Sequence, residues 1–218
     1  MRDDLGLKYI LNTPSGKPDD AELPLVIIMH GRGADARDLA DIAPYIDNDA
    51  GCRFVFPNAP RPFEMYPGMT FGWSWFDGWP PTPESIAASR VVLLQFLDDV
   101  TARYPTPRGK LIVGGFSQGA MMSFDCGFRT QQPVAGIIAM SGAIFETEMP
   151  PFRPLPVLVI HGSQDDMIPV LAARRARRVL EEHGIEPEYH EFPMGHNVTP
   201  ESLAVVREFI QSALLRSE

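Results

Sequence analysis

The sequence predicts an α/β protein whose mostly parallel central sheet of about seven strands is covered by helices on both faces. Short apolar, β-branched runs alternate along the chain with segments of helical period, which is the pattern of such a fold. Leu25–Met29 and Val157–Ile160 are apolar at every position, as expected of strands buried on both faces. A length of 218 residues suits one domain, so we expect a single domain over residues 1–218 without a large cap domain.

Seven runs are expected to form strands, and the first lies at an edge of the sheet because its composition is mixed. The strands are Leu7–Leu11, Leu25–His30, Arg53–Phe56, Lys110–Gly114, Val134–Met140, Pro156–His161 and Glu188–Phe192. The helices are Ala36–Asp47, Glu84–Arg103, Gln118–Phe128, Pro169–His183 and Pro200–Leu215. Gly184 suits a left-handed residue after the fourth helix. Thr199 suits the N-cap of the fifth helix, whose apolar residues should face the sheet.

One long segment, Pro57–Pro83, has neither strand nor helix period. It is rich in proline, glycine and aromatic residues. Long loops in compact domains are usually functional or disordered, and the aromatic content argues against disorder. We therefore expect an ordered loop that packs over the carboxyl edge of the sheet.

The composition is acidic, with a formal net charge of -9 at pH 7 and a sequence pI of about 5.0. This balance repels phosphate backbones and anionic lipids, so we expect neither nucleic-acid binding nor stable membrane association. The polar start of the chain does not read as a signal peptide, and the longest apolar runs have only strand length. Cys52 and Cys126 make no disulfide framework, so we expect reduced thiols in a soluble, cytoplasmic protein.

The strongest chemical signal is the pentapeptide Gly115–Gly119, with the letters GFSQG. It follows the apolar run Leu111–Val113 and precedes a predicted helix, which is the strand–turn–helix setting of a nucleophile elbow. A serine on such a tight turn projects its hydroxyl clear of the sheet, and bulky flanking residues would collide with the neighbouring elements. The dipole of the following helix favours negative charge at the turn. Ser117 is therefore the expected nucleophile.

A nucleophilic serine needs a base, and the chain has five histidines. His30 and His161 each end a predicted strand and are expected to be structural. His183 lies at a helix C-terminus, and His190 lies within a predicted strand. His196 follows the last strand and precedes the last helix, which matches the chain order serine, acid, histidine of this fold. It is the expected general base.

The acid should follow the penultimate strand, where Asp165 and Asp166 are adjacent. A buried carboxylate that accepts the Nδ1–H of the histidine fixes its tautomer and stabilises the imidazolium. Alternatively, one of the two carboxylates only caps the following helix. Residue chemistry alone does not choose between them.

The chain resembles the phospholipase/carboxylesterase family of α/β-hydrolases, which includes bacterial carboxylesterases and acyl-protein thioesterases. The resemblance covers nearly the whole chain. It is carried by His30–Asp35 (HGRGAD), Trp75–Asp77 (WFD), Gly115–Ala120 (GFSQGA), His161–Pro169 (HGSQDDMIP) and Gly195–His196. It implies the α/β-hydrolase fold. It also implies that Asp165 is the catalytic acid, because Asp166 fills a variable position of the H-G-x-x-D-x-x-[VI]-P pattern.

An oxyanion hole needs backbone N–H donors near the nucleophile. The residue after the serine, Gln118, supplies one. The resemblance implies that Arg32 supplies the second through its main chain, although family members usually carry a hydrophobic residue there. The aromatic side chains of the long loop either line a substrate site or simply cover the sheet. They are Trp73, Trp75, Phe76 and Trp79.

These features together predict a serine carboxylesterase that hydrolyses short- to medium-chain esters through an acyl-enzyme. An acyl thioesterase or lysophospholipase would share the whole apparatus. A ligand-binding protein without activity is a further alternative, because fold alone does not imply function. No cofactor or metal motif is present in the sequence, so neither is expected. The expected partner is a small-molecule ester, and the resemblance is compatible with a homodimer.

Overall fold

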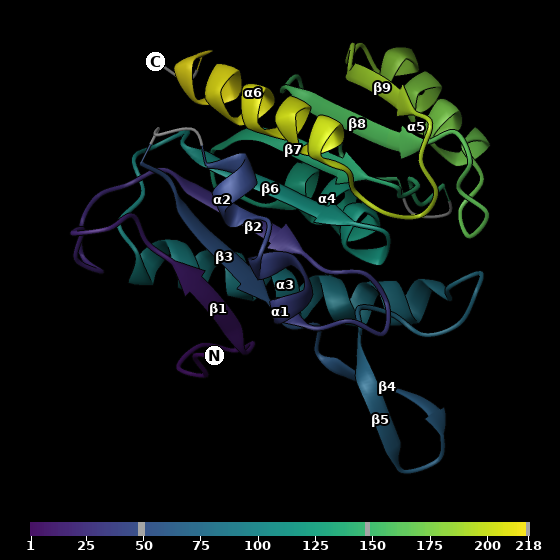
Figure 1. Ribbon diagram of the computed structural model, residues 1–218, viewed down its shortest axis with the longest axis horizontal. Coiled ribbons are helices and arrows are strands. Elements are labelled where there is room, and N and C mark those ends of the chain that lie inside the picture. The colour runs from purple at the N-terminus through teal and green to yellow at the C-terminus, as the bar shows by residue number, and fades with distance from the viewer. Residues whose placement is uncertain (48–50, 147–148, 217–218) are drawn as a thin grey trace.

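A computed structural model of the chain describes residues 1–47, 51–146 and 149–216. Its centre is a seven-stranded sheet with the order β1-β3-β2-β6-β7-β8-β9 (Figure 1). The strands are β1 (Tyr9–Asn12), β2 (Leu25–Met29), β3 (Arg53–Pro57), β6 (Leu111–Phe116), β7 (Val134–Met140), β8 (Val157–Gly162) and β9 (Glu188–Phe192). Strand β1 is antiparallel to its neighbour, and every other pairing in this sheet is parallel. The predicted strands and the edge position of the first are confirmed.

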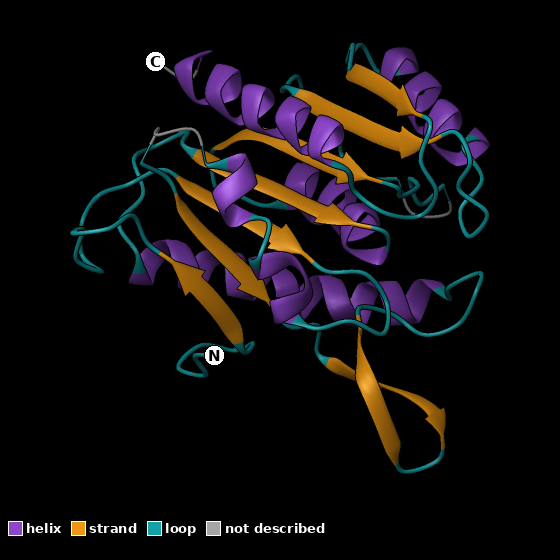
Figure 2. Ribbon diagram, in the orientation of Figure 1, coloured by secondary structure: helices purple, strands orange, loops and turns teal. Residues whose placement is uncertain are grey.

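Helices cover both faces of this sheet (Figure 2). They are α1 (Ala36–Ala40), α2 (Ala43–Ile46), α3 (Pro83–Arg103), α4 (Gln118–Arg129), α5 (Leu171–Glu182) and α6 (Pro200–Arg216). The apolar residues of α1, α2 and α6 share one buried cluster with one face of the sheet, and those of α3 to α5 fill the clusters on the other face. The run in β2 is fully apolar because both of its faces are buried: Val26 and Ile28 belong to the cluster that contains α1, α2 and α6, while Ile27 and Met29 belong to the cluster that contains α3 and α4.

The first predicted helix is divided in two. The chain forms α1, turns through Asp41 and Ile42, and then forms α2. Pro44 lies in the first turn of α2. A proline lacks the N–H that a continuous helix needs and its ring clashes with the carbonyl one turn earlier, so one unbroken helix over Ala36–Asp47 is excluded. The other helices agree with prediction within two residues at each end, and Gly184 has the expected positive φ of 76°.

The segment Pro57–Pro83 is not a loop throughout, and this prediction was wrong. It contains a β-hairpin of β4 (Arg61–Tyr66) and β5 (Met69–Ser74), which projects away from the sheet (Figure 1). The base of the hairpin is joined to the loop after β2 by two hydrogen bonds, from Gly33 N to Trp73 O and from Trp73 N to Ala34 O, both 2.8 Å long. Backbone pairing between β4 and β5 thus orders the part of this segment that was expected to be an irregular loop. The Pro-Gly pair at 67–68 is the turn signal that could have predicted it.

The fold brings the carboxyl ends of the parallel strands to one edge of the sheet. Three segments meet there: the loop after β2, the start of α4 after β6, and the turn after β8. Open α/β sheets bind ligands at this edge. In the parts of the chain that the structure describes, no helix is long and apolar enough to cross a membrane.

Candidate active site

Ser117 lies on the sharp turn between β6 and α4. Its φ of 56° and ψ of -119° are outside the regions that non-glycine residues favour, so the turn is strained. The backbone N–H of Ser117 donates to Met140 O at 2.9 Å, which ties the turn to β7. Surrounding structure that holds a strained serine in place is a common property of reactive sites.

The two glycines of the pentapeptide are required by close backbone contacts. A Cβ on Gly119 would lie 2.1 Å from Met29 O, and one on Gly115 would lie 2.3 Å from the carbonyl carbon of Gly119. Both neighbours are backbone, which cannot move aside as a side chain can. The start of α4 can therefore approach β2 and β6 only without side chains at these positions.

The structure brings Ser117, His196 and Asp165 together. His196 Nε2 lies 2.9 Å from Ser117 Oγ, and His196 Nδ1 lies 2.7 Å from Asp165 Oδ2. An ionised carboxylate only accepts hydrogen bonds, so Nδ1 carries the proton and Nε2 is free to accept one from the serine. The Asp165 side chain is fully buried, whereas the adjacent Asp166 is exposed. The geometry therefore gives only Asp165 contact with the histidine.

The Asp165 carboxylate is held by its own turn. Its Oδ1 accepts the backbone N–H groups of Met167 at 3.0 Å and Ile168 at 2.8 Å. The buried His161 lies on the other side, with Nε2 donating to Ile168 O at 2.8 Å and lying 3.4 Å from Asp165 Oδ2. His161 thus supports the turn that carries Asp165, a contact that the sequence did not reveal.

The loop after β2 is positioned by His30. Its Nδ1–H donates to Gly31 O at 2.7 Å, and its Nε2 accepts the N–H of Ala59 at 3.0 Å. Burial lowers the pKa of His30, which keeps the ring neutral as these bonds require. Trp75 Nε1 donates to His30 O at 2.8 Å. These contacts fix the backbone around Arg32, the residue expected to supply an oxyanion donor.

The side chain of Gln118 joins the Trp75–Asp77 segment to the turn that carries Ser117. Its Oε1 accepts the N–H of Trp75 at 3.0 Å and lies 3.1 Å from Ser74 Oγ, and its Nε2 donates to Phe76 O at 3.0 Å. Its backbone N–H is at the N-terminus of α4, beside Ser117. The side chain therefore has a structural task, and the backbone has the position expected of an oxyanion donor.

A cavity of about 460 Å³ opens beside Ser117, which is a size typical of small-molecule sites. Its lining combines polar, aromatic and aliphatic side chains. The residues that line it are Arg32, Phe63 and Trp79, which also border a neighbouring cavity, together with Met121, Met167, Ile168, Ser117, Gln118 and His196. Phe63, Met121, Met167 and Ile168 were not among the expected site residues, because no local motif marks a pocket wall assembled from distant segments.

Of the four expected aromatic residues, only Trp79 lines this cavity. Trp75 is fully buried and supports the His30 loop, while Trp73 pairs with Ala34 at the base of the hairpin. Phe76 is also buried and borders the adjoining cavity of about 680 Å³ between the hairpin and the 77–79 turn. The structure thus gives Trp75 the covering position that was the alternative to substrate contact.

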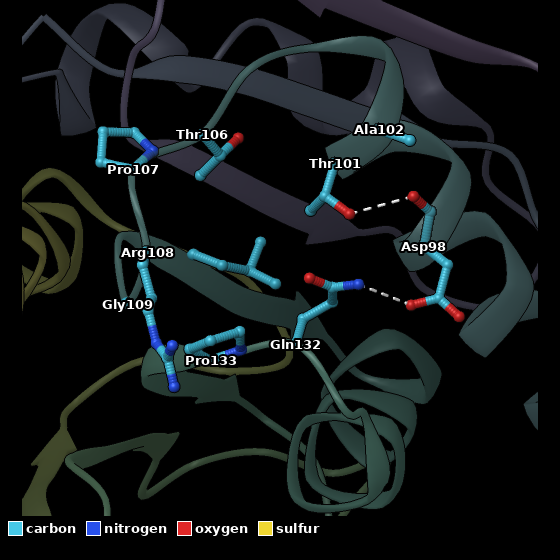
Figure 3. Close-up of a pocket in the computed structure, with 10 residues that line it drawn as sticks. Asp98, Thr101, Ala102, Thr106, Pro107, Arg108, Gly109, Gln132 and Pro133 are labelled. Carbon is cyan, nitrogen blue, oxygen red and sulfur yellow. Dashed lines mark hydrogen bonds between the residues drawn. The ribbon is translucent and has the colours of Figure 1, made fainter.

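A further cavity of about 370 Å³ lies at the opposite edge of the sheet, at the amino end of β6, where Leu111 begins that strand (Figure 3). Two of its polar side chains have partners in the fold: Gln132 donates to Asp98 at 2.8 Å, and Thr101 donates to the backbone of its own helix. Among the described residues, no group of three or more His, Cys, Asp or Glu side chains could hold a metal ion. The hydrogen-bonded Ser117, His196 and Asp165 lie at the other, carboxyl edge of the sheet.

The fold and the Ser117 site together define the class of the protein as an α/β-hydrolase. The sequence matches the family model described as phospholipase/carboxylesterase over residues 16–214, and the chain belongs to this family. It is a carboxylic ester hydrolase. The predicted resemblance is confirmed.

Individual relatives agree with this assignment. The chain is 27% identical to "Acyl-protein thioesterase 1" of Mycosarcoma maydis, over 94% of this chain and 96% of that protein. It is 31% identical to the crystal structure of esterase PE8, with a TM-score of 0.83 and coverage of 95% and 99% of the two chains. The Bacillus cereus carboxylesterase shares the fold, with 19% identity, a TM-score of 0.77 and coverage of 95% and 94%.

Proposed function

We propose that this protein is a serine carboxylesterase that hydrolyses short- to medium-chain esters through an acyl-enzyme. The observation that carries the proposal is the continuous hydrogen-bonded chain from Ser117 through His196 to Asp165, beside a cavity of small-molecule size. The serine is strained, buried and adjacent to a helix N-terminus, which is where an attacking alkoxide and a developing oxyanion are stabilised.

The reaction follows from this geometry. Ser117 Oγ attacks the ester carbonyl while His196 Nε2 accepts its proton, and Asp165 stabilises the imidazolium. The carbonyl oxygen becomes an oxyanion between the backbone N–H groups of Gln118 and Arg32. His196 then protonates the leaving alcohol. Water attacks the acyl-enzyme by the reverse sequence and regenerates the serine.

The size and lining of the cavity favour a short or medium acyl chain in the substrate. About 460 Å³ accommodates a short or medium acyl chain, and the apolar side chains of Met121, Met167 and Ile168 suit such a chain. The same apparatus would cleave a thioester, and three curated relatives are named acyl-protein thioesterases or a homologue of one. A thioesterase is therefore the second candidate. A lysophospholipase shares the mechanism but needs room for a long acyl chain.

The test is hydrolysis of p-nitrophenyl esters from acetate to palmitate, with wild type beside Ser117→Ala and with butyryl thioesters in parallel. Wild type should be most active on the short members, and Ser117→Ala should lower turnover by about 10⁶. Faster hydrolysis of the thioester than of the matched oxygen ester would move the assignment to the second candidate. If the wild-type protein hydrolyses neither esters nor thioesters, both enzyme candidates are rejected and the ligand-binding alternative remains.

The proposal also includes a cytoplasmic location and a homodimeric state. Both cysteines are unpaired and buried, which is consistent with a reducing, cytoplasmic environment. Burial raises the pKa of Cys52 to about 12 and raises that of Cys126 as well, so both thiols are unreactive. A homodimer stays a prediction, to be tested by light scattering.

A further inference from the structure

A cationic side chain lines the Ser117 cavity. Arg32 is exposed, and it borders both this cavity and the adjoining one beside the hairpin. Its guanidinium carbon lies 4.8 Å from the centre of the Phe63 ring. Stacking on an aromatic face orients a guanidinium without neutralising its charge, because the ring carries no net charge.

The acidic groups near Arg32 are engaged elsewhere. Asp77 pairs with Arg61 at 3.1 Å, and Glu64 accepts the N–H of Gly68 at 3.0 Å. Arg32 has no ion-pair partner within 4.0 Å among residues 1–47, 51–146 and 149–216. By contrast, Arg37 in the same segment pairs with Asp35 at 3.1 Å. An unneutralised cation at the mouth of the cavity is distinctive in a chain with a formal net charge of -9.

Two groups of lining residues differ in what they would accept. Met121, Met167 and Ile168 are apolar, whereas Arg32, Phe63 and Trp79, which also border the adjoining cavity, combine a cation with two aromatic rings. We propose that Arg32 makes the enzyme select esters that carry a carboxylate on one side of the scissile bond and an apolar group on the other. The planar guanidinium presents parallel N–H donors that match both oxygens of a carboxylate.

This inference rests on the proposed function, because it concerns the substrate of the same serine. Matched pairs of anionic and neutral substrates isolate the effect of the carboxylate on hydrolysis. One pair is 4-butyryloxybenzoate and the uncharged 4-butyryloxybenzamide, which differ in the charge on the alcohol side and slightly in the reactivity of the phenol, an intrinsic difference that cancels when the ratios of two enzyme variants are compared. The other is monomethyl glutarate and the methyl ester of glutaramic acid, which differ in the same way on the acid side. The measured quantity is the ratio of kcat/KM for the anionic member to that for the neutral member.

In wild type the ratio should be about 10 or more for at least one pair, as one charge-assisted hydrogen-bonded contact supplies. Arg32→Met should reduce that ratio to about 1, mainly through KM, since the contact is made with the substrate before and during the reaction. Arg37→Met removes the same charge outside the cavity and should keep the wild-type ratio. Arg32→Lys should retain part of it, and 0.5 M NaCl should weaken it.

The outcomes separate this inference from the proposed function. Equal kcat/KM within both pairs in wild type, or a ratio that Arg32→Met does not change, would overturn the selectivity while the esterase stands. Loss of the ratio in Arg37→Met as well would assign it to overall charge and would also overturn the role of Arg32. If wild type hydrolyses no ester, neutral or anionic, the proposed function fails and the selectivity fails with it.

Discussion

Replacing Asp165 by Asn tests the whole hydrogen-bonded chain, because the structure dictates how the amide must sit. The Oδ1 position faces two backbone donors, the N–H groups of Met167 and Ile168. If the amide nitrogen took that position, both donors would lose their acceptor, and the loss at the buried N–H of Ile168 alone would cost about 1–3 kcal/mol. The amide oxygen therefore occupies it, and the amide nitrogen faces His196 at the place where Oδ2 lies 2.7 Å from Nδ1.

An amide nitrogen donates, so it forces Nδ1 of His196 to become the acceptor. The ring proton then moves to Nε2, the nitrogen that lies 2.9 Å from Ser117 Oγ. A protonated Nε2 cannot accept the serine proton. We expect kcat to fall by about 10⁴, the loss known when a triad histidine is held in the wrong tautomer, which corresponds to about 5 kcal/mol.

The assay is p-nitrophenyl butyrate hydrolysis, with circular dichroism to verify that the variant is folded. Asp166→Asn is the matched control, since Asp166 is adjacent and exposed, and its kcat should stay within about twofold of wild type. An Asp165→Asn protein that keeps more than a tenth of wild-type kcat would refute the tautomer argument. Loss of activity in Asp166→Asn alone would transfer the role of the acid to that residue.

Three further predictions concern the support of the site. Gln118→Ala leaves the buried N–H of Trp75 without its acceptor and should lower the free energy of unfolding in urea by about 2 kcal/mol. Gly119→Ala places a Cβ 2.1 Å from Met29 O, so the free energy of unfolding in urea should fall by about 3 kcal/mol or more. A urea midpoint equal to that of wild type would contradict the close approach of the two backbone segments. Burial lowers the pKa of His30 in the folded protein, so below about pH 6.5 the unfolded chain binds a proton at His30 that the folded chain does not. The free energy of unfolding therefore decreases as the pH falls. His30→Gln should therefore show a shallower loss of unfolding free energy between pH 7 and pH 5 than wild type, and parallel curves would contradict it.

Ser117 and His196 could be singled out from the sequence because a local motif marks the serine and the chain order marks the histidine. The pentapeptide around Ser117 combines glycines whose absent side chains allow a tight backbone contact with a serine between a strand and a helix. His196 was singled out by its place in the chain order. Buried parallel strands are likewise marked by short continuous apolar runs, so all seven strands of the main sheet were predicted.

Other features depended on contacts between distant segments. The choice between Asp165 and Asp166 rests on which carboxylate meets a histidine 31 residues later, and adjacent residues in a turn point in different directions. The β4–β5 hairpin rests on cross-strand bonds and on its attachment to the loop after β2, neither of which leaves a periodic pattern. The same attachment moves Trp73 to the base of the hairpin and away from the cavity.

The sequence by itself determined the fold class, the positions of the main strands along the chain and the residue types available at the serine turn, because backbone propensity, apolar periodicity and glycine requirements act over a few residues. Only the tertiary structure decided which acid meets His196, which side chains form the walls of the cavity, and that Arg32 faces it without an ionic partner among the described residues. These properties arise where segments far apart in the chain pack against one another. Their geometry is set by the packing of the whole fold, and no single stretch of sequence encodes it.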